Sequence, residues 1–263
     1  MRDFRGLAVA AGLAVMLACA PALAASGTAL GVDPSAEAET AGKLRVLTVG
    51  ADISIGDNVK TGPEGQVQIK FSDKTELVVG PNSSLVIEDY LLRDDQSAGK
   101  FAINALAGTF RFATGGAAKD RYIIKTPTGT IGVRGTAFDF NVGAEGTEVL
   151  LFHGAVLLCN LKNECVTLDG TCEIGSYDLA ESTLIGAAED TKGDQRRALR
   201  EAFTYAQVQT PLMREFWVEQ ARQCFNQGFV NNVPESLVKD EDDAPVDNGC
   251  GGEGFSEGCE YPH

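Results

Sequence analysis

The pattern of hydrophobic and polar positions changes once along the chain, near residue 187. Before that point, apolar residues alternate with polar ones in short runs, as in Val67, Ile69 and Phe71. Alternation with a period of two predicts half-buried β-strands. Glycine, asparagine, aspartate or proline separates most of the runs, which is typical of turns between strands. The sequence therefore predicts a mainly β protein with an all-β domain over residues 44–186, and periodicity alone leaves a sandwich, a roll and a short solenoid open.

After residue 187 the apolar spacing becomes helical. Leu199 and Phe203 lie near one stripe of a helix expected within residues 190–208, and a second helix is expected from Pro211 to about Gln227. A short helical pair over residues 187–230 is thus predicted to follow the β domain and to pack on it or on itself.

Two large aromatic residues in the second expected helix are candidates for a partner contact. Phe216 and Trp217 are adjacent in the sequence. We expect these two side chains to pack in the core or between the helices, and docking of a partner is the alternative interpretation.

The first 24 residues have the pattern of a secretory signal peptide. Arg2 and Arg5 precede an apolar run that ends at Cys19, and Ala22-Leu-Ala24 is a small-x-small cleavage site. We expect cleavage after Ala24 and a periplasmic or extracellular protein. Lipidation at Cys19 is the alternative, because residues 16–19 resemble a lipobox. The chain after residue 24 has no apolar run of the roughly 20 residues needed to span a membrane.

Two further segments contain few large apolar side chains that could be buried in a core. Residues 25–43 are small and polar and are expected to form a flexible lead-in, and residues 231–263 read as a disordered acidic tail rich in glycine. The run Asp240–Asp243 lacks the ligand spacing of an EF-hand, so no metal is expected there.

The charge balance is strongly acidic, with 22 basic and 37 acidic residues and a formal net charge of −15. Such a surface repels phosphate backbones, so nucleic acid is not expected as a partner.

The cysteines predict disulfides, because an even number of them follows an export signal. Six lie beyond residue 24: Cys159, Cys165, Cys172, Cys224, Cys250 and Cys259. Six cysteines allow fifteen pairings. The glycine-rich loop between Cys250 and Cys259 favours a local bridge there. Of Cys159, Cys165 and Cys172, two are expected to pair with each other and the third with Cys224.

Residues 126–140 form the most specific motif of the chain, reading Thr-Pro-Thr-Gly-Thr-Ile-Gly-Val-Arg-Gly-Thr-Ala-Phe-Asp-Phe. Proline suits a strand start, the glycines permit close backbone approach, and the end alternates as a strand. The residues expected to carry this structural motif are Thr126, Pro127, Gly132, Val133, Arg134, Gly135, Thr136 and Phe138. Arg134 is expected to donate hydrogen bonds to neighbouring carbonyl groups, with binding of an acidic group as the alternative.

This motif resembles the hallmark of the FecR-type extracytoplasmic domain. Upstream, residues 56–62 (Gly-Asp-Asn-Val-Lys-Thr-Gly), 71–75 (Phe-Ser-Asp-Lys-Thr) and 80–83 (Gly-Pro-Asn-Ser) match further pieces of that family in order. Lys74 stands where the family usually has glycine, a departure that costs little if the turn does not need a positive φ. The resemblance covers roughly residues 44–180 and implies a solenoid-like β fold.

The sequence contains no pattern of catalytic residues, so we do not expect an enzyme. No nucleophile, base or carboxylate pair converges in a recognisable pattern, and His153 reads as a turn residue. No catalytic, cofactor-binding or metal-binding residue is therefore expected.

The resemblance implies an exported interaction module. FecR-type regulators usually carry a cytoplasmic anti-sigma segment and a transmembrane helix, and here the β domain follows the signal peptide almost directly. We therefore expect a non-catalytic module that binds another envelope protein or a cell-wall polymer in sensing or assembly. The alternative is a structural, self-associating envelope or surface protein.

Overall fold

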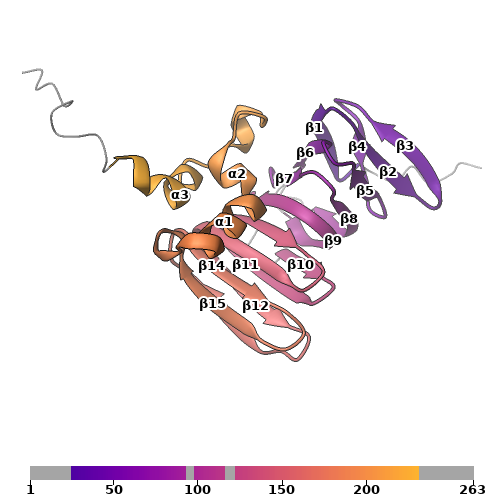
Figure 1. Cartoon of the computed structure of the whole chain (residues 1–263). Coiled ribbons are helices and arrows are strands. Elements are labelled where there is room, and N and C mark those ends of the chain that lie inside the picture. The colour runs from indigo at the N-terminus through magenta and orange to yellow at the C-terminus, as the bar shows by residue number, and fades with distance from the viewer. Residues whose placement is uncertain (1–24, 93–97, 116–121, 231–263) are drawn as a thin grey trace, which may run out of the picture. The chain divides into compact units, whose positions relative to one another are not determined.

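The computed structural model describes residues 25–92, 98–115 and 122–230 (Figure 1). Contacts divide the chain into two units, Met1–Asn226 and Gln227–His263, and the sheet described below lies in the first of them.

The described residues form fifteen strands in one sheet, so the predicted mainly β class is confirmed. The strands are β1 (Gly27–Asp33), β2 (Ala36–Thr40), β3 (Lys43–Leu47), β4 (Asp52–Ile53), β5 (Asn58–Thr61), β6 (Gln66–Phe71), β7 (Glu76–Val79), β8 (Ser84–Leu92), β9 (Ala98–Ala113), β10 (Tyr122–Thr126), β11 (Gly129–Val142), β12 (Thr147–Asn160), β13 (Cys165–Leu168), β14 (Glu173–Tyr177) and β15 (Ser182–Ala187).

The three longest strands, β9, β11 and β12, belong to two rows of the sheet at once. The first row runs β15–β14–β12–β11–β9–β7–β6–β1–β4 and uses residues 137–142 of β11. The second row runs β13–β12–β11–β10–β9–β8–β5–β2–β3 and uses residues 129–133 of β11. The sheet therefore bends where these long strands pass from one row to the other.

Two facing glycines allow this bend in β11 and β12. Gly135 has φ +66° and Gly154 has φ +87°, and the pairing register shifts between Arg134 and Ala137. A Cβ atom on Gly154 would lie 2.2 Å from the carbonyl oxygen of Gly135, so a side chain cannot be accommodated there. The glycine of the Val-Arg-Gly-Thr motif is thus a bending point of the sheet.

One hydrophobic core lies between the two rows. The ring of Phe71 in β6 of the first row lies 4.9 Å, centroid to centroid, from the ring of Phe101 in the second-row half of β9. Phe138 and Phe140 are fully buried in the same core, as the alternating pattern predicts. Burial of a large apolar side chain contributes about 1.5–3 kcal/mol, so these aromatic residues hold the two rows together.

The expectation of a flexible lead-in over residues 25–43 is wrong. Most of these residues form β1 and β2, and β3 begins at Lys43. Ala29, Ala36 and Ala38 are buried in the core between the rows. Their side chains are small, so the segment has low hydrophobicity although it contributes to the core. The β domain therefore begins well before residue 44.

The first expected helix is confirmed in part, and the second is interrupted. The helical elements are η1 (Ala188–Asp190), α1 (Gly193–Ala202), α2 (Thr204–Gln207), η2 (Arg214–Phe216) and α3 (Ala221–Val230). Residues 211–227 do not form one helix, because side chains bind backbone groups that a helix would use. The side chain of Gln209 bonds both backbone groups of Val218, and the indole N–H of Trp217 donates to the carbonyl oxygen of Leu212.

Lys74 occupies a left-handed turn between β6 and β7, with φ +69°. For a residue with a side chain, this conformation destabilises the folded state by roughly 1–2 kcal/mol. Glycine avoids this strain, but its greater conformational freedom in the unfolded chain cancels part of the gain in stability. We expect Lys74→Gly to raise the free energy of unfolding by about 0.5–1 kcal/mol in urea titrations. Lys74→Ala is the control, since alanine has the same conformational strain, and an equal gain from both variants would contradict this explanation.

Candidate interaction site

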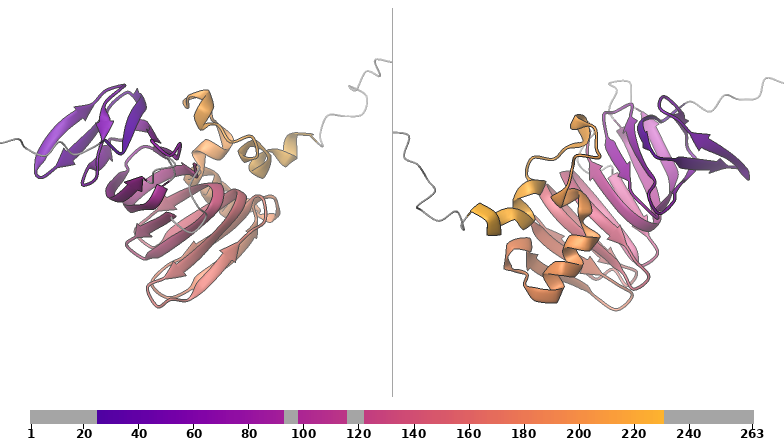
Figure 2. Two further views of the ribbon diagram at one scale, coloured as in Figure 1. Left: turned by 180° about the vertical axis from the view of Figure 1, so that it is seen from behind. Right: turned by 45° about the horizontal axis from the view of Figure 1, so that its top comes forward.

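A helical segment, residues 188–225, covers the outer face of the first row (Figure 2). Leu199, Phe203 and Val218 of this segment pack against Leu150 and Phe152 of β12 in one buried cluster. A second, smaller cluster joins the segment to β7 and β1. The segment and the sheet therefore share buried surface from β12 to β1 of the row.

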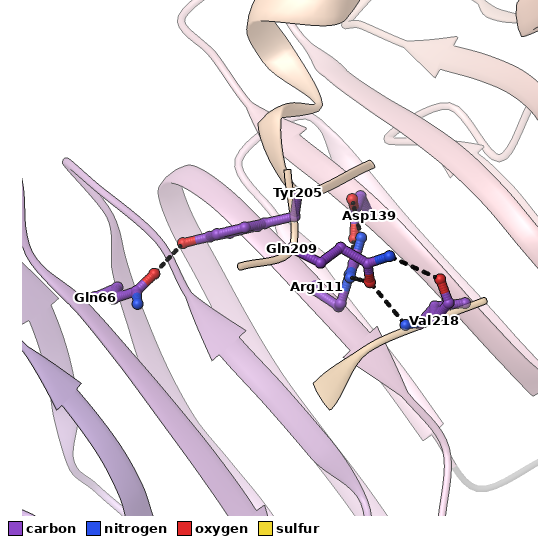
Figure 3. A network of polar contacts seen from close by, with 6 residues as sticks. All are labelled: Gln66, Arg111, Asp139, Tyr205, Gln209 and Val218. Carbon is purple, nitrogen blue, oxygen red and sulfur yellow. Dashed lines mark hydrogen bonds and ion pairs between the residues drawn. The ribbon is translucent and has the colours of Figure 1, made fainter. Parts of the chain in front are cut away.

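A buried ion pair lies beneath the helical segment (Figure 3). The Nε and Nη2 atoms of Arg111 in β9 donate to the two carboxylate oxygens of Asp139 in β11 at 2.7 and 2.9 Å. The exposed fractions of these side chains are 2% for Arg111 and 0% for Asp139. The two hydrogen bonds are parallel and charge-assisted, which is the strong geometry for this pair.

Gln209 extends the ion pair into the helical segment. Its side-chain oxygen accepts hydrogen bonds from Nη1 of Arg111 at 2.5 Å and from the backbone N–H of Val218 at 2.8 Å. Its side-chain nitrogen donates to the carbonyl oxygen of Val218 at 3.0 Å. One glutamine thus connects the sheet to two points of the segment, and we call Arg111, Asp139 and Gln209 the buried clamp.

Aromatic rings complete the surroundings of the clamp. The guanidinium of Arg111 lies 5.1 Å from the ring centroid of Phe152 and 5.9 Å from that of Tyr205. The Tyr205 hydroxyl donates to the side-chain oxygen of Gln66 in β6 at 3.0 Å, and burial raises the pKa of Tyr205. Burial also raises the pKa of Asp139, and the charge of Arg111 opposes this shift. The clamp is buried and its polar groups are hydrogen-bonded, so it can hold the helical segment on the sheet.

The hallmark motif contributes to the core and to the bend of the sheet. Thr126 is buried, and its hydroxyl lies 3.0 Å from the hydroxyl of Tyr177. Thr136 is also buried, and its hydroxyl has no partner in the described part of the chain. The expected structural role of Arg134 is wrong: its side chain is exposed and forms no hydrogen bond within the described residues, because it lies on the outer surface of the second row.

His153 is also placed differently from the expectation. It lies within β12, pairs with Ala137 and is exposed, so it is a strand residue beside the Gly154 bend.

Two disulfides agree with the expected arrangement of the cysteines. Cys159 pairs with Cys165 across β12 and β13, and Cys172 pairs with Cys224. The second bridge attaches the helical segment to the residue just before β14. The expected Cys250–Cys259 pair lies outside the described residues.

The two candidate contact residues have different environments. Phe216 is buried, with an exposed fraction of 2%, in a cluster with Val78, Tyr205 and Leu212. It is therefore a packing residue, because its ring faces the sheet. Trp217 packs against the same cluster but is only half-buried, so part of its side chain is exposed.

Trp217 lies close to two exposed arginines. The guanidinium groups of Arg214 and Arg222 lie 5.2 and 4.8 Å from its ring centroid, distances at which cation–π attraction acts. Neither arginine forms an ion pair within the described residues. Met213, with an exposed fraction of 42%, lies next to this group in sequence. We call Met213, Arg214, Trp217 and Arg222 the Trp217 surface, and its chemistry suits a partner that offers acidic and apolar groups.

Sequence reasoning missed the buried clamp. In the sequence, Arg111 is a single polar residue between Phe110 and Phe112. Its partner Gln209 lies 98 residues further along the chain, so no local pattern indicates the contact. The alternation indicated that Arg111 and Asp139 point away from the core, and only the folded helical segment shows that this outer face is also buried.

Two further properties concern metals and membranes. Within residues 25–92, 98–115 and 122–230, no group of three or more histidine, cysteine, aspartate and glutamate side chains could hold a metal ion. Across the same ranges, no helix is both long and apolar enough for a membrane crossing.

Residues 57–157 match the family described as FecR protein, so the chain contains a FecR domain over these residues. The match runs from Asp57, the residue before β5, into β12 and includes the long strands that bend the sheet. The family resemblance of the sequence motifs is thereby confirmed.

Solved structures that match part of this chain include two crystal structures of a candidate anti-sigma factor from Parabacteroides distasonis. They have TM-scores of 0.41 and 0.40 and 12% sequence identity, and they cover 55% and 54% of this chain. This chain spans 63% and 62% of theirs, less than two thirds of their length. No curated protein matches the chain significantly.

Proposed function

We propose that this protein is a non-catalytic interaction module of the bacterial envelope that binds another envelope protein or a polymer in sensing or assembly. The Trp217 surface is the observation that carries this proposal. An acidic chain here presents its single tryptophan beside two arginines that form no ion pair within the described residues. Tryptophan and arginine, with tyrosine, are enriched among the residues that dominate binding energy at protein interfaces.

The surroundings of Trp217 favour binding because they fix the side chain in advance. Its indole N–H donates to the carbonyl oxygen of Leu212 at 2.9 Å, and its neighbour Phe216 is anchored in the sheet. Gln209 of the buried clamp bonds both backbone groups of Val218, the next residue. A contact residue held in this way loses little conformational entropy on binding.

The proposed location is the periplasm or the extracellular space. The signal-peptide pattern of residues 1–24 supports it, and so do the two disulfides, which persist in oxidising compartments.

A crosslinking pull-down from envelope extracts of the source bacterium, read by mass spectrometry, tests the function. We expect the purified protein to recover one envelope protein or polymer, and Trp217→Ala to reduce recovery at least about tenfold, as for an interface hot spot. Leu157→Ala is the matched control, because Leu157 is an apolar residue with 45% exposure on the second row. We expect this control to bind as the wild type does.

Two results would count against the proposal. Equal recovery by Trp217→Ala and the wild type would remove the Trp217 surface from the contact. Recovery of the protein alone would favour the alternative, a structural, self-associating envelope protein.

A further inference from the structure

We propose that the edge strand β3 is a homodimer interface, in which two copies pair their β3 strands antiparallel about a twofold axis at Arg45. This interface is separate from the Trp217 surface and goes beyond the proposed function. The first reason is position: within the described residues β3 pairs with β2 and with no other strand, so one side of it is a free sheet edge (Figure 1).

The hairpin geometry shows which backbone groups are free. Ala41 and Gly42 form a two-residue turn, with φ +49° and +75° between the paired residues Thr40 and Lys43. A two-residue turn of this kind is closed by a hydrogen-bonded pair, and such pairs alternate along the ladder. The amides and carbonyls of Leu44 and Val46 therefore point away from β2, toward the free edge.

The same two residues expose apolar side chains. Leu44 is 59% exposed and Val46 is 64% exposed. Leu47, in contrast, is buried in the core. The free hydrogen-bonding groups and the exposed aliphatic side chains thus belong to the same two positions. An exposed apolar edge with unpaired backbone groups is a template for another strand.

A second copy of β3 fits this edge. With the twofold axis at Arg45, Leu44 of each copy lies opposite Val46 of the other. Both residues offer free amides and carbonyls, so four backbone hydrogen bonds form, and the leucine and valine side chains meet on one face. Such an interface is self-complementary, as twofold symmetry requires.

Charge does not oppose this pairing locally. Arg45 faces its copy across the axis, but it forms an ion pair with the buried carboxylate of Asp57 and donates to the carbonyl oxygen of Asp52 at 2.9 Å. The hairpin, residues 36–47, carries two acidic and two basic residues and is neutral, although the whole chain has a net charge of −15. The edge is thus a place where two acidic molecules can approach.

The other edge strands are less suitable. β4 has two residues and β13 has four, so they offer few hydrogen bonds. β15 has an irregular register with β14 and a left-handed residue, Gly186, with φ +118°. Short or irregular edges are the usual protection against strand pairing, and β3 has neither feature.

Sedimentation velocity of the purified protein from about 5 to 500 µM tests the proposal. A small interface of this kind is weak, so we expect a reversible dimer with a dissociation constant on the order of 100 µM. Val46→Pro should weaken dimerisation at least about tenfold. Proline removes the amide hydrogen that faces the free edge and leaves the bonds to β2 in place. Val46→Thr, which keeps this amide, is the matched control and should weaken dimerisation by about threefold at most.

A second measurement uses the wild type, so it does not depend on whether the proline variant folds. Amide exchange of the wild type should slow at Leu44 and Val46 as concentration rises, and Trp217→Ala should leave this protection unchanged. A protein that stays monomeric at 500 µM would overturn the proposal. So would a dimer in which Leu44 and Val46 exchange as fast as in the monomer, or one that Val46→Pro does not weaken. None of these results would alter recovery of a partner through the Trp217 surface.

Discussion

Replacing Arg111 with methionine is expected to lower the free energy of unfolding by about 3–5 kcal/mol, because it leaves a buried carboxylate without its cation. Asp139 is fully buried, and Arg111 is its charge partner. The same change removes a hydrogen-bond donor to Gln209, so the helical segment is weakened together with the sheet. Guanidinium unfolding followed by circular dichroism measures the total loss. Fluorescence of Trp217, the single tryptophan, reports on the helical segment.

A double variant separates the cost of the unpaired charge from the loss of packing. Arg111→Met with Asp139→Leu should be more stable than Arg111→Met alone, since replacing both members of a buried ion pair by apolar residues is often nearly neutral. If Arg111→Met alone costs less than about 1 kcal/mol, the ion pair does not hold the two elements together as argued.

Removing the Cys172–Cys224 disulfide is expected to cost about 4 kcal/mol. Its two cysteines are 52 residues apart, and a crosslink over a loop of this length strongly restricts the unfolded chain. Urea unfolding of the variant with both cysteines replaced by serine measures the loss. Proteolysis should cut the helical segment of this variant before it cuts the sheet, because the bridge attaches the segment beside β14.

The second disulfide provides the matched control for this prediction. Cys159 and Cys165 are only six residues apart, so replacing both should cost less, about 2 kcal/mol. Equal losses from the two double variants would contradict the dependence on loop length. An unchanged pattern of proteolysis would show that the clamp and the apolar clusters hold the segment without the bridge.

Local patterns predicted much of the β domain. The alternation of Phe138, Asp139 and Phe140 indicated which side chains enter the core, and the structure places both phenylalanines there and Asp139 on the opposite face. The ordered motifs identified the FecR domain that the family match shows. These features depend on neighbours in the sequence or on a pattern shared by a family.

The features that sequence reasoning missed depend on distant parts of the chain. Ala29 and Ala38 looked too small to form a core, and they are buried because β1 and β2 pair with β6 and β5. Phe216 and Trp217 are adjacent and equally apolar, so no period could show that the first is buried and the second is half-exposed. This difference arises from the short η2 turn and from the bonds that Gln209 and Trp217 make to the backbone.

The structure divides the helical segment into an inner and an outer side. Gln209 and Phe216 face the sheet and hold the segment, whereas the half-buried Trp217 packs on the cluster of Phe216 and is partly exposed beside two exposed arginines. The function that we propose depends on this division, because a fixed segment presents the Trp217 surface in one conformation.

Site-specific photocrosslinking in the living bacterium tests the central claim most directly. A photoreactive phenylalanine analogue is placed at Met213 on the Trp217 surface or, as the control, at Leu157 on the second row, two positions of similar exposure. The account predicts that the analogue at position 213 crosslinks to one envelope component and that the analogue at position 157 does not. Crosslinks only from position 157, or only between copies of the protein, would contradict it.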